Sequence, residues 1–187
     1  MSPTDLTQYT QMRRKDRAIQ DDEWIVDFLR TIPFGSLATV ADGQPFLHTN
    51  LFVYDAAAHA LYFHTARDGR TPRNLAASGR VCFSAAQMGR LLPNEVALEF
   101  SVEFSSVVAF GTACLVANEA EAVHALQLLL DKYFPHLHPG KDYRPITEDE
   151  RQATAVYRID VEEWSVKRIA VAEDFPGAFF WKDRPAG

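Results

Sequence analysis

Cysteine is scarce in this chain of 187 residues, which contains only Cys82 and Cys114. Both lie inside apolar, strand-like runs, and no C-x-x-C spacing occurs. The chain therefore lacks the cysteine framework of small disulfide-stabilised proteins. The pattern predicts two buried free thiols in a reducing cytoplasm, and a disulfide or redox pair is the alternative.

Long apolar runs and an excess of positive charge are also missing. No run approaches the roughly 20 residues that span a membrane, and the polar start lacks the apolar region of a signal peptide. The formal net charge is −6, whereas nucleic-acid-binding domains usually carry a basic footprint. We therefore expect a cytoplasmic protein that binds neither a membrane nor nucleic acid. Its local basic clusters, at residues 13–17 and 67–80, suit a small phosphorylated ligand better than a polymer.

Common catalytic and nucleotide-binding motifs are absent as well. The chain has no G-x-S-x-G, H-E-x-x-H, Walker or G-x-G-x-x-G pattern. The pair His136-Leu137-His138 has alternating histidines, but the flanking Pro135 and Pro139 favour a loop, and no third ligand is nearby. We therefore predict no metal site.

The chain does contain enough apolar material for one core, with 47% hydrophobic residues. We expect a flexible N-terminal segment at 1–11, a folded domain at 12–170 and an aromatic C-terminal tail at 171–187. The tail, with Phe175, Phe179, Phe180 and Trp181, could contact a second subunit or cover a pocket.

Six stretches are typical of β-strands, and most are joined by hairpins or short helices. We expect strands at residues 34–41, 45–54, 60–65, 80–86, 97–117 and 153–166, the fifth bent or broken by Gly111. Helices are expected after the capping residues Asp21 and Asn118 and at 71–77, and loops at 89–94 and 134–149. This order favours a mainly β, α+β fold, an antiparallel barrel with peripheral helices, over a doubly wound parallel sheet.

The junction at residues 60–74 is the most informative segment. A strand ends at His64 and Thr65, Asp68-Gly69 is a turn signal, and a helix with proline in its first turn follows. Free N–H groups at a helix start, with arginines beside them, attract a phosphate. The alternative is a solvated turn with surface arginines.

The strand at 45–53 is a second candidate for ligand contact. Its side chains alternate, so His48 and Asn50 share one face, and Thr49 and Leu51 share the other. His48 and Asn50 could reach a ligand together, or the strand could simply be half-buried with polar residues facing water.

The segment Phe63-His-Thr-Ala-Arg-Asp-Gly-Arg-Thr71 resembles the F-Y-T-x-x-x-S-R-K segment of the pyridoxamine 5'-phosphate oxidase-like flavoproteins. The opening Met12-Arg-Arg-Lys-Asp-Arg-Ala-Ile19 and the run Tyr62-Phe-His-Thr-Ala66 resemble the nitroimidazole-resistance (Nim) branch more closely. The similarity covers roughly residues 12–168. It implies the six-stranded FMN-binding split barrel, FMN as the cofactor, and a homodimer with a flavin pocket built from both chains.

The resemblance also assigns roles to individual residues. Arg70 matches the arginine that grips the FMN phosphate, and Thr71 stands where the family has lysine, so one positive charge is lost. The other cofactor-binding residues that we expect are His48, Thr49, Asn50, Leu51, His64, Thr65, Asn74, Trp164 and Lys167. Trp164 matches a tryptophan near the flavin in the oxidases, although a core tryptophan would explain it almost as well.

The activity implied by the Nim likeness is two-electron reduction of a small aromatic or nitro compound. His64 is the candidate catalytic residue, because the matching histidine in Nim proteins lies over the active site, where an imidazole could relay protons. It could instead only pack against the flavin. Three alternatives remain: a non-catalytic flavin-binding sensor or scavenger, a pyridoxamine 5'-phosphate oxidase, and a haem or deazaflavin protein on the same barrel. The oxidase's R-x-H motif is absent after Lys167, and no haem-ligand signature stands out in the sequence.

Overall fold

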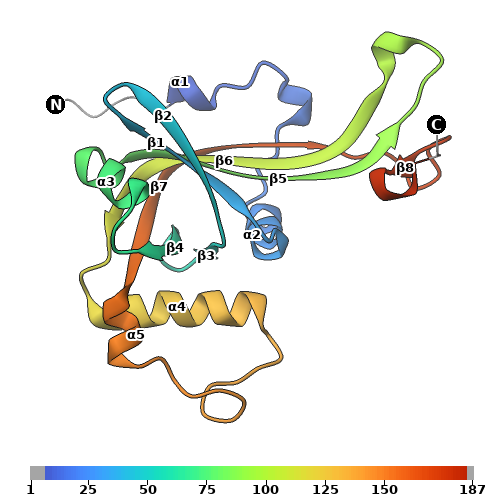
Figure 1. Ribbon diagram of the computed structural model, residues 1–187. Helices are drawn as coiled ribbons and strands as arrows, with labels where there is room; N and C mark the ends of the chain where they lie inside the picture. The colour runs from blue at the N-terminus through green and yellow to red at the C-terminus, as the bar shows by residue number, and fades with distance from the viewer. Residues whose placement is uncertain (1–6, 185–187) are drawn as a thin grey trace.

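Alternating apolar residues and tight turns fold most of the chain into one antiparallel sheet, which curls around a core (Figure 1). The computed structural model describes residues 7–184, so residues 1–6 of the predicted flexible segment and 185–187 of the tail lie outside it. The strands are β1 (Gly35–Ala41), β2 (Gln44–Asn50), β3 (Val53–Asp55), β4 (Ala60–Ala66), β5 (Arg80–Leu92), β6 (Ser101–Leu115), β7 (Thr154–Ile169) and β8 (Phe179–Phe180).

The strands pair in the order β2-β1-β5-β6-β7-β4-β3, and β8 is added to β5. Every ladder between named strands is antiparallel. The two ends of this path, β2 and β3, are consecutive in the chain and are joined by Leu51 and Phe52. The predicted α+β class and split-barrel fold are therefore confirmed.

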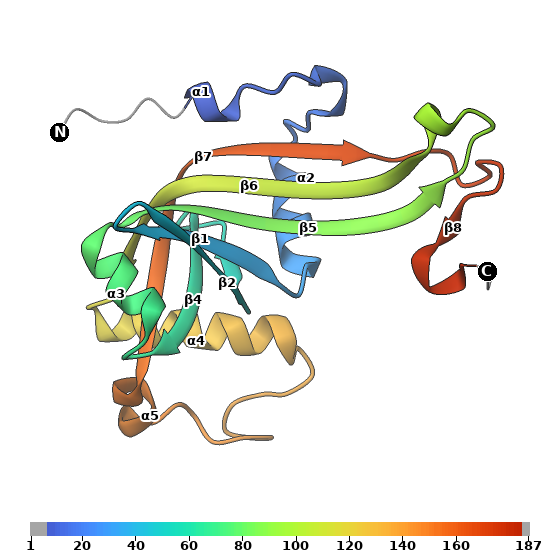
Figure 2. The same cartoon turned by 45° about the horizontal axis from the view of Figure 1, so that its top comes forward.

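The predicted count of six strands is wrong, because the described residues form eight. The expected strand at 45–54 is divided at Leu51-Phe52, and the aromatic tail supplies β8. The expected loop at 89–94 is mostly strand, since β5 continues to Leu92 and pairs with β6 beyond the barrel. The two strands form a long arm, and the C-terminal segment lies against it (Figure 2).

Besides the pairing of β8 with β5, an ion pair within the arm bonds the backbone of this C-terminal segment. Arg90 donates to Glu103 at 2.8 Å and to the carbonyl oxygen of Glu173 at 2.7 Å, and Glu103 accepts the Val171 N–H at 2.9 Å. These bonds keep the pKa of Glu103 low, at about 2. Phe179 and Phe180 pair with Leu91 and Arg90 of β5, so these two aromatics attach to the arm of their own chain.

The helices are α1 (Thr7–Thr10), α2 (Asp22–Thr31), α3 (Arg70–Ala77), α4 (Glu119–Tyr133) and α5 (Glu148–Ala153), with 3-10 turns η1 (Lys15–Arg17), η2 (Ala97–Glu99) and η3 (Trp181–Asp183). The predicted caps are confirmed: Asp21 accepts the Trp24 N–H at 3.2 Å, and Asn118 accepts the Glu121 N–H at 2.9 Å. Helix α5 begins at the end of the expected loop 134–149 and continues to Ala153, and it starts with a capping box between Thr147 and Glu150.

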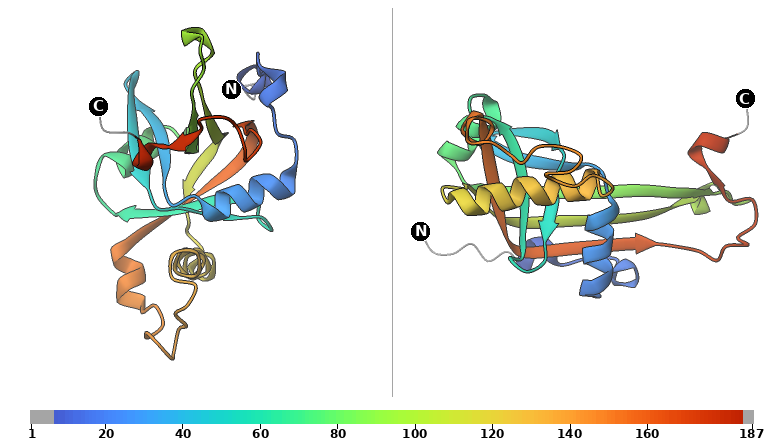
Figure 3. Two further views of the ribbon diagram at one scale, coloured as in Figure 1. Left: turned by 90° about the vertical axis from the view of Figure 1, so that its right-hand side faces the viewer. Right: turned by 90° about the horizontal axis from the view of Figure 1, so that it is seen from below.

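Strand β4 separates two apolar clusters. Leu61 and Phe63 point into the barrel, and Ala60 and Tyr62 point toward α4, which crosses the outer side of the strands (Figure 3). This is the alternation that a strand with two covered faces requires.

Gly111 bends the sheet, as predicted. The register of β6 against β7 shifts between Phe110 and Gly111. A Cβ atom at Gly111 would lie 2.0 Å from the carbonyl oxygen of Asp160, so only glycine allows this approach. The strand is bulged and is not broken.

The two thiols are free, but neither is buried as predicted. Cys82 is half-buried and Cys114 is exposed, because the outer face of the barrel leaves both strands open to solvent there. Within the described residues, no helix is long and apolar enough to cross a membrane.

Lys132 joins α4 to the barrel, and it has no carboxylate partner among residues 7–184. Its ammonium group donates to the carbonyl oxygens of Leu29 at 3.0 Å and Phe52 at 2.9 Å, and lies 3.6 Å from the centre of the Phe52 ring. Burial lowers the pKa of Lys132 from 10.5 to about 8.

We predict that Lys132 makes the free energy of unfolding depend on pH. Between pH 8 and 10.5 the unfolded chain binds a proton that the folded chain has released, so the free energy of unfolding rises with pH across this window. The rise is at most about 3 kcal/mol. Urea unfolding at several pH values should show it in the wild type and not in Lys132→Met. The exposed Lys141→Met serves as the control, and parallel curves for wild type and Lys132→Met would contradict the assignment.

Candidate functional site

Two hollows lie on opposite sides of β4, and consecutive residues of that strand face them. Thr65 lines a hollow of about 250 Å³ at the start of α3. His64 lines a larger chamber of about 440 Å³ beneath α4. We call them the α3 hollow and the α4 chamber. The side-chain alternation of a strand places the two residues on different faces.

The α3 hollow collects residues that the sequence predicts to bind phosphate. It is lined by Phe46, His48, Thr65, Ala66, Asp68, Gly69, Arg70, Thr71 and Pro72. These residues come from β2, the end of β4, the turn at Asp68 and Gly69, and the first turn of α3. The predicted convergence of the two segments is therefore present in the structure.

Gly69 shapes the start of α3. Its φ of 148° and ψ of −177° are accessible almost only to glycine, and no side chain caps the helix. The Arg70 and Thr71 N–H groups have no acceptor within the helix, as in any first turn. They leave a partial positive charge that favours an anion.

The three arginines of this segment have different partners. Arg73 pairs with Asp68 at 2.9 Å, and Arg67 donates to the carbonyl oxygens of Gln152 and Arg151. Arg70 has no carboxylate partner among residues 7–184, and its guanidinium lies 5.3 Å from the centre of the Phe46 ring. Arg70 is thus the arginine of this segment that has neither a carboxylate nor a carbonyl acceptor among the described residues, so its donors stay available for a ligand.

Asp68 is the competing anion at this helix start. Its carboxylate accepts the Gly69 N–H at 2.8 Å and is neutralised by Arg73. The side chain is 91% exposed, so it can turn into water when a phosphate arrives.

Two other predicted residues, Thr71 and Asn74, hold α3 in place against the sheet. The Thr71 hydroxyl lies 3.1 Å from Nδ1 of His48, and Thr71 is buried. Asn74 is also buried and donates to the Thr39 hydroxyl at 2.8 Å, away from the hollow. These two hydrogen bonds fix α3 to β1 and β2, so both residues position the helix start.

The remaining predictions on the second strand divide between the two faces. Asn50 is buried and donates to the His48 carbonyl oxygen at 3.2 Å, and Thr49 lies on the exposed side with its hydroxyl 3.2 Å from that of Ser36. Leu51 lines the α4 chamber. Among these residues, only His48 lines the α3 hollow itself.

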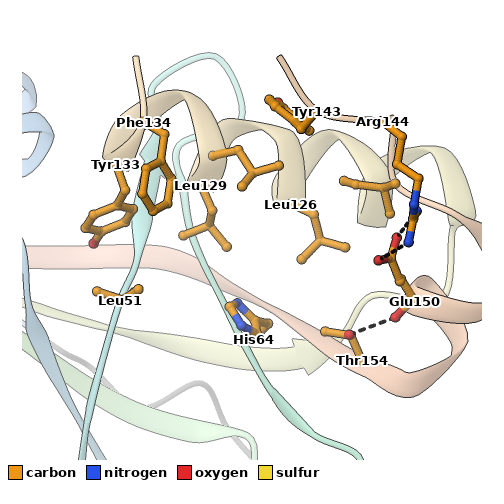
Figure 4. Close-up of a pocket in the computed structure, with 12 residues that line it drawn as sticks. Leu51, His64, Leu126, Leu129, Tyr133, Phe134, Tyr143, Arg144, Glu150 and Thr154 are labelled. Carbon is orange, nitrogen blue, oxygen red and sulfur yellow. Dashed lines mark hydrogen bonds and ion pairs between the residues drawn. The ribbon is translucent and has the colours of Figure 1, made fainter. Parts of the chain in front are cut away.

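The α4 chamber is mainly apolar (Figure 4). Leu51 and His64 form its floor, and the side chains of α4 and of the segment after it form the other walls. Those walls are Leu126, Leu129, Leu130, Tyr133, Phe134, Tyr143, Arg144, Ile146, Glu150 and Thr154.

His64 is the chemically free group in this chamber. Loss of water contact lowers the pKa of His64, which favours the neutral imidazole. Within the described residues its ring has no hydrogen-bond partner, whereas both phenols are engaged. Tyr133 donates to the Pro33 carbonyl oxygen at 2.7 Å, and Tyr143 accepts from Gln127 at 2.9 Å.

Trp164 and Lys167 are not brought to either hollow within one chain. The Trp164 ring packs against His59 at 5.1 Å and Tyr54 at 5.9 Å between ring centres, at the other end of β4. Lys167 pairs with Ser106 in the sheet and with Ala18 in an isolated bridge.

The sequence indicated the α3 hollow but not the chamber. The chamber side of α4 carries Leu126, Leu130 and Tyr133, and all three are only partly buried. The sequence signal for a chamber would have been an apolar face of α4 that is wider than the barrel surface against which the helix packs. No group of three His, Cys, Asp or Glu residues that could hold a metal ion occurs in residues 7–184.

Comparison with known proteins identifies the family. The family model described as pyridoxamine 5'-phosphate oxidase matches residues 21–168. The chain belongs to this family. A search of curated protein sequences gives no match.

Solved structures of this barrel type support the assignment. An FAD and haem binding protein from Mycobacterium smegmatis has a TM-score of 0.73 and 25% identity, covering 81% of this chain and 73% of that one. The flavocytochrome Anf3 from Azotobacter vinelandii has a TM-score of 0.75 and 25% identity, covering 96% and 87%. A candidate 5-nitroimidazole antibiotic resistance protein from Bacteroides thetaiotaomicron, with a TM-score of 0.68 and 19% identity, covers 81% and 86% and shows the fold alone. Of these structures, the Mycobacterium smegmatis protein is named for binding FAD and haem, and the Azotobacter vinelandii protein is named as a flavocytochrome.

Proposed function

We propose that this protein is a flavin-dependent oxidoreductase whose flavin phosphate binds in the α3 hollow. The observation that carries the proposal is the uncapped start of α3 beside Arg70, which has no carboxylate partner among the described residues. Flavin supplies the electron-transfer chemistry. The chain supplies the anion site, and the Thr71–His48 contact orients the helix start.

FMN is the flavin that we favour. The α3 hollow is small, and it offers one free arginine and one free helix turn, which suit a single terminal phosphate. The relatives named for FAD make the dinucleotide the competing ligand. Titration of the purified protein with FMN and with FAD separates the two.

We further propose that the active site lies between two subunits and reduces a small aromatic or nitro compound. Trp164 and Lys167 do not line the α3 hollow of their own chain, and this supports the proposal because a second copy could bring them to the flavin. The free thiols fit the reducing cytoplasm that we propose as the location. NADH oxidation with nitroaromatic acceptors separates this enzyme from an inert flavin-binding protein.

Arg70→Ala should weaken flavin binding by about 1.5–3 kcal/mol, as expected for the loss of a charge-assisted hydrogen bond. Fluorescence quenching of FMN on titration with protein measures the change. Arg30→Ala is the control, because Arg30 pairs with Asp27 on α2 and neither residue lines the α3 hollow, so the affinity should stay within about 0.5 kcal/mol. Equal affinities for wild type and Arg70→Ala would remove Arg70 from the site.

A haem group in the α4 chamber is the second candidate function. His64 offers an imidazole without a partner among the described residues, and it lies exposed on the floor of a chamber with mainly apolar walls, where an axial haem ligand could reach a ring that covers it. Two of the similar structures are named as an FAD and haem binding protein and a flavocytochrome. Haem would add one-electron chemistry to the flavin, with His64 holding the iron.

His64→Ala should separate the two cofactors. We expect the variant to retain flavin, because His64 faces away from the α3 hollow, and to lose any Soret band that haem addition produces in the wild type. Absorption spectra and flavin titration of both proteins measure this. A variant that keeps an unchanged Soret band would exclude His64 as the iron ligand. A wild type with no Soret band would leave His64 only its proposed catalytic role, seen as altered turnover.

A further inference from the structure

The segment between α4 and α5 forms a strap across the mouth of the α4 chamber. Phe134, Tyr143, Arg144 and Ile146 line the chamber from this segment. Most of its hydrogen bonds are internal, such as Asp142 N–H to the His138 carbonyl oxygen at 2.9 Å. Among residues 7–184, the side-chain hydrogen bond that ties this segment to α4 runs from Gln127 to the Tyr143 hydroxyl, at 2.9 Å.

One ion pair closes the end of this strap. The terminal nitrogens of Arg144 donate to the two carboxylate oxygens of Glu150, each at 2.9 Å (Figure 4). Arg144 is the only cationic side chain among the described residues that line the chamber, apart from the titratable His64. Its side chain is 64% exposed.

Both Arg144 and Glu150 have hydrogen-bonding capacity outside their ion pair. Glu150 also accepts the Thr147 N–H and the Thr147 hydroxyl, both at 3.0 Å, so its carboxylate stays satisfied if Arg144 turns. Arg144 has five N–H donors. Glu150 and the Pro145 carbonyl oxygen take three of them. The Nε–H and the second Nη2–H have no acceptor among residues 7–184, and these two donors form a fork that matches a carboxylate.

From this we propose that the chamber selects a flat, apolar ligand that carries a carboxylate, and that Arg144 binds the carboxylate at the mouth while His64 contacts the ring system from the floor. This rests on the haem candidate of the proposed function and names the part of the ligand that gives selectivity. Haem has this chemistry, because its porphyrin is apolar and its two propionates are carboxylates. The apolar lining favours the porphyrin ring, and the two free N–H donors of Arg144 at the mouth of the chamber favour a carboxylate.

Two porphyrins that differ only at the rim test the proposal. Haem carries propionates, and iron octaethylporphyrin carries ethyl groups on the same kind of ring. Both are titrated into the full-length protein and followed by the Soret band. We expect wild type to bind haem about tenfold more tightly than the ethyl compound, and Arg144→Met to lose that preference while keeping its affinity for iron octaethylporphyrin.

Two further variants control for the ion pair itself. Arg30→Met removes an arginine of similar exposure, 68%, that pairs with Asp27 outside the chamber, and should change neither affinity. Glu150→Gln can still accept from Thr147 and frees Arg144, so haem should bind as tightly as in wild type or up to threefold more tightly.

The results of these titrations distinguish haem binding in the chamber from carboxylate binding by Arg144. If both porphyrins bind through His64 with equal affinity and Arg144→Met changes neither, the carboxylate role of Arg144 is overturned and the haem site stands. If Glu150→Gln weakens haem as Arg144→Met does, the ion pair acts only by holding the strap, and the proposal is likewise overturned. If neither porphyrin binds to wild type, the haem candidate fails, and this inference fails with it.

Discussion

The organisation of this protein depends on the two-sided burial of β4. A strand with both faces covered must alternate its side chains between two environments, and β4 alternates between the barrel core and the cluster beneath α4. Where the strand ends, the same alternation continues into two hollows. Thr65 faces the start of α3, and His64 faces the chamber. One strand therefore serves two candidate sites that are separated by a single sheet layer.

The α3 hollow is a locally basic site on an acidic protein. The chain is acidic overall, with a net charge of −6, so anions are not attracted to the surface in general. Local pairing then removes most of the basic residues from competition, since Arg73 and Arg67 are occupied by protein acceptors. Arg70 and the free first turn of α3 remain. The donors that would bind a phosphate are therefore the Arg70 guanidinium and the first N–H groups of α3, which have no protein acceptor in the described part of the chain.

Local signals in the sequence predicted much of this fold. Turn residues, caps and alternation indicated β1, β4, α2 and α4, and the barrel class follows from their order. The length of β5 could not be predicted, because its outer half is stabilised by pairing with β6 and β8 beyond the barrel, which is a long-range effect. The site was predicted where residues are close in sequence, as at Arg70. The chamber was missed because Leu51, His64 and Arg144 come together only through tertiary packing, and Asn74 was assigned to the ligand although it binds Thr39.

The central claim is that the phosphate of the flavin, and not only its ring, holds the cofactor. Comparing the affinity of the flavin-free wild-type protein for FMN with its affinity for riboflavin, which lacks the phosphate, tests this directly by calorimetry. The account predicts that FMN binds at least about tenfold more tightly, a difference of about 1.4 kcal/mol. Equal affinity for the two compounds, or no binding of either, would contradict it.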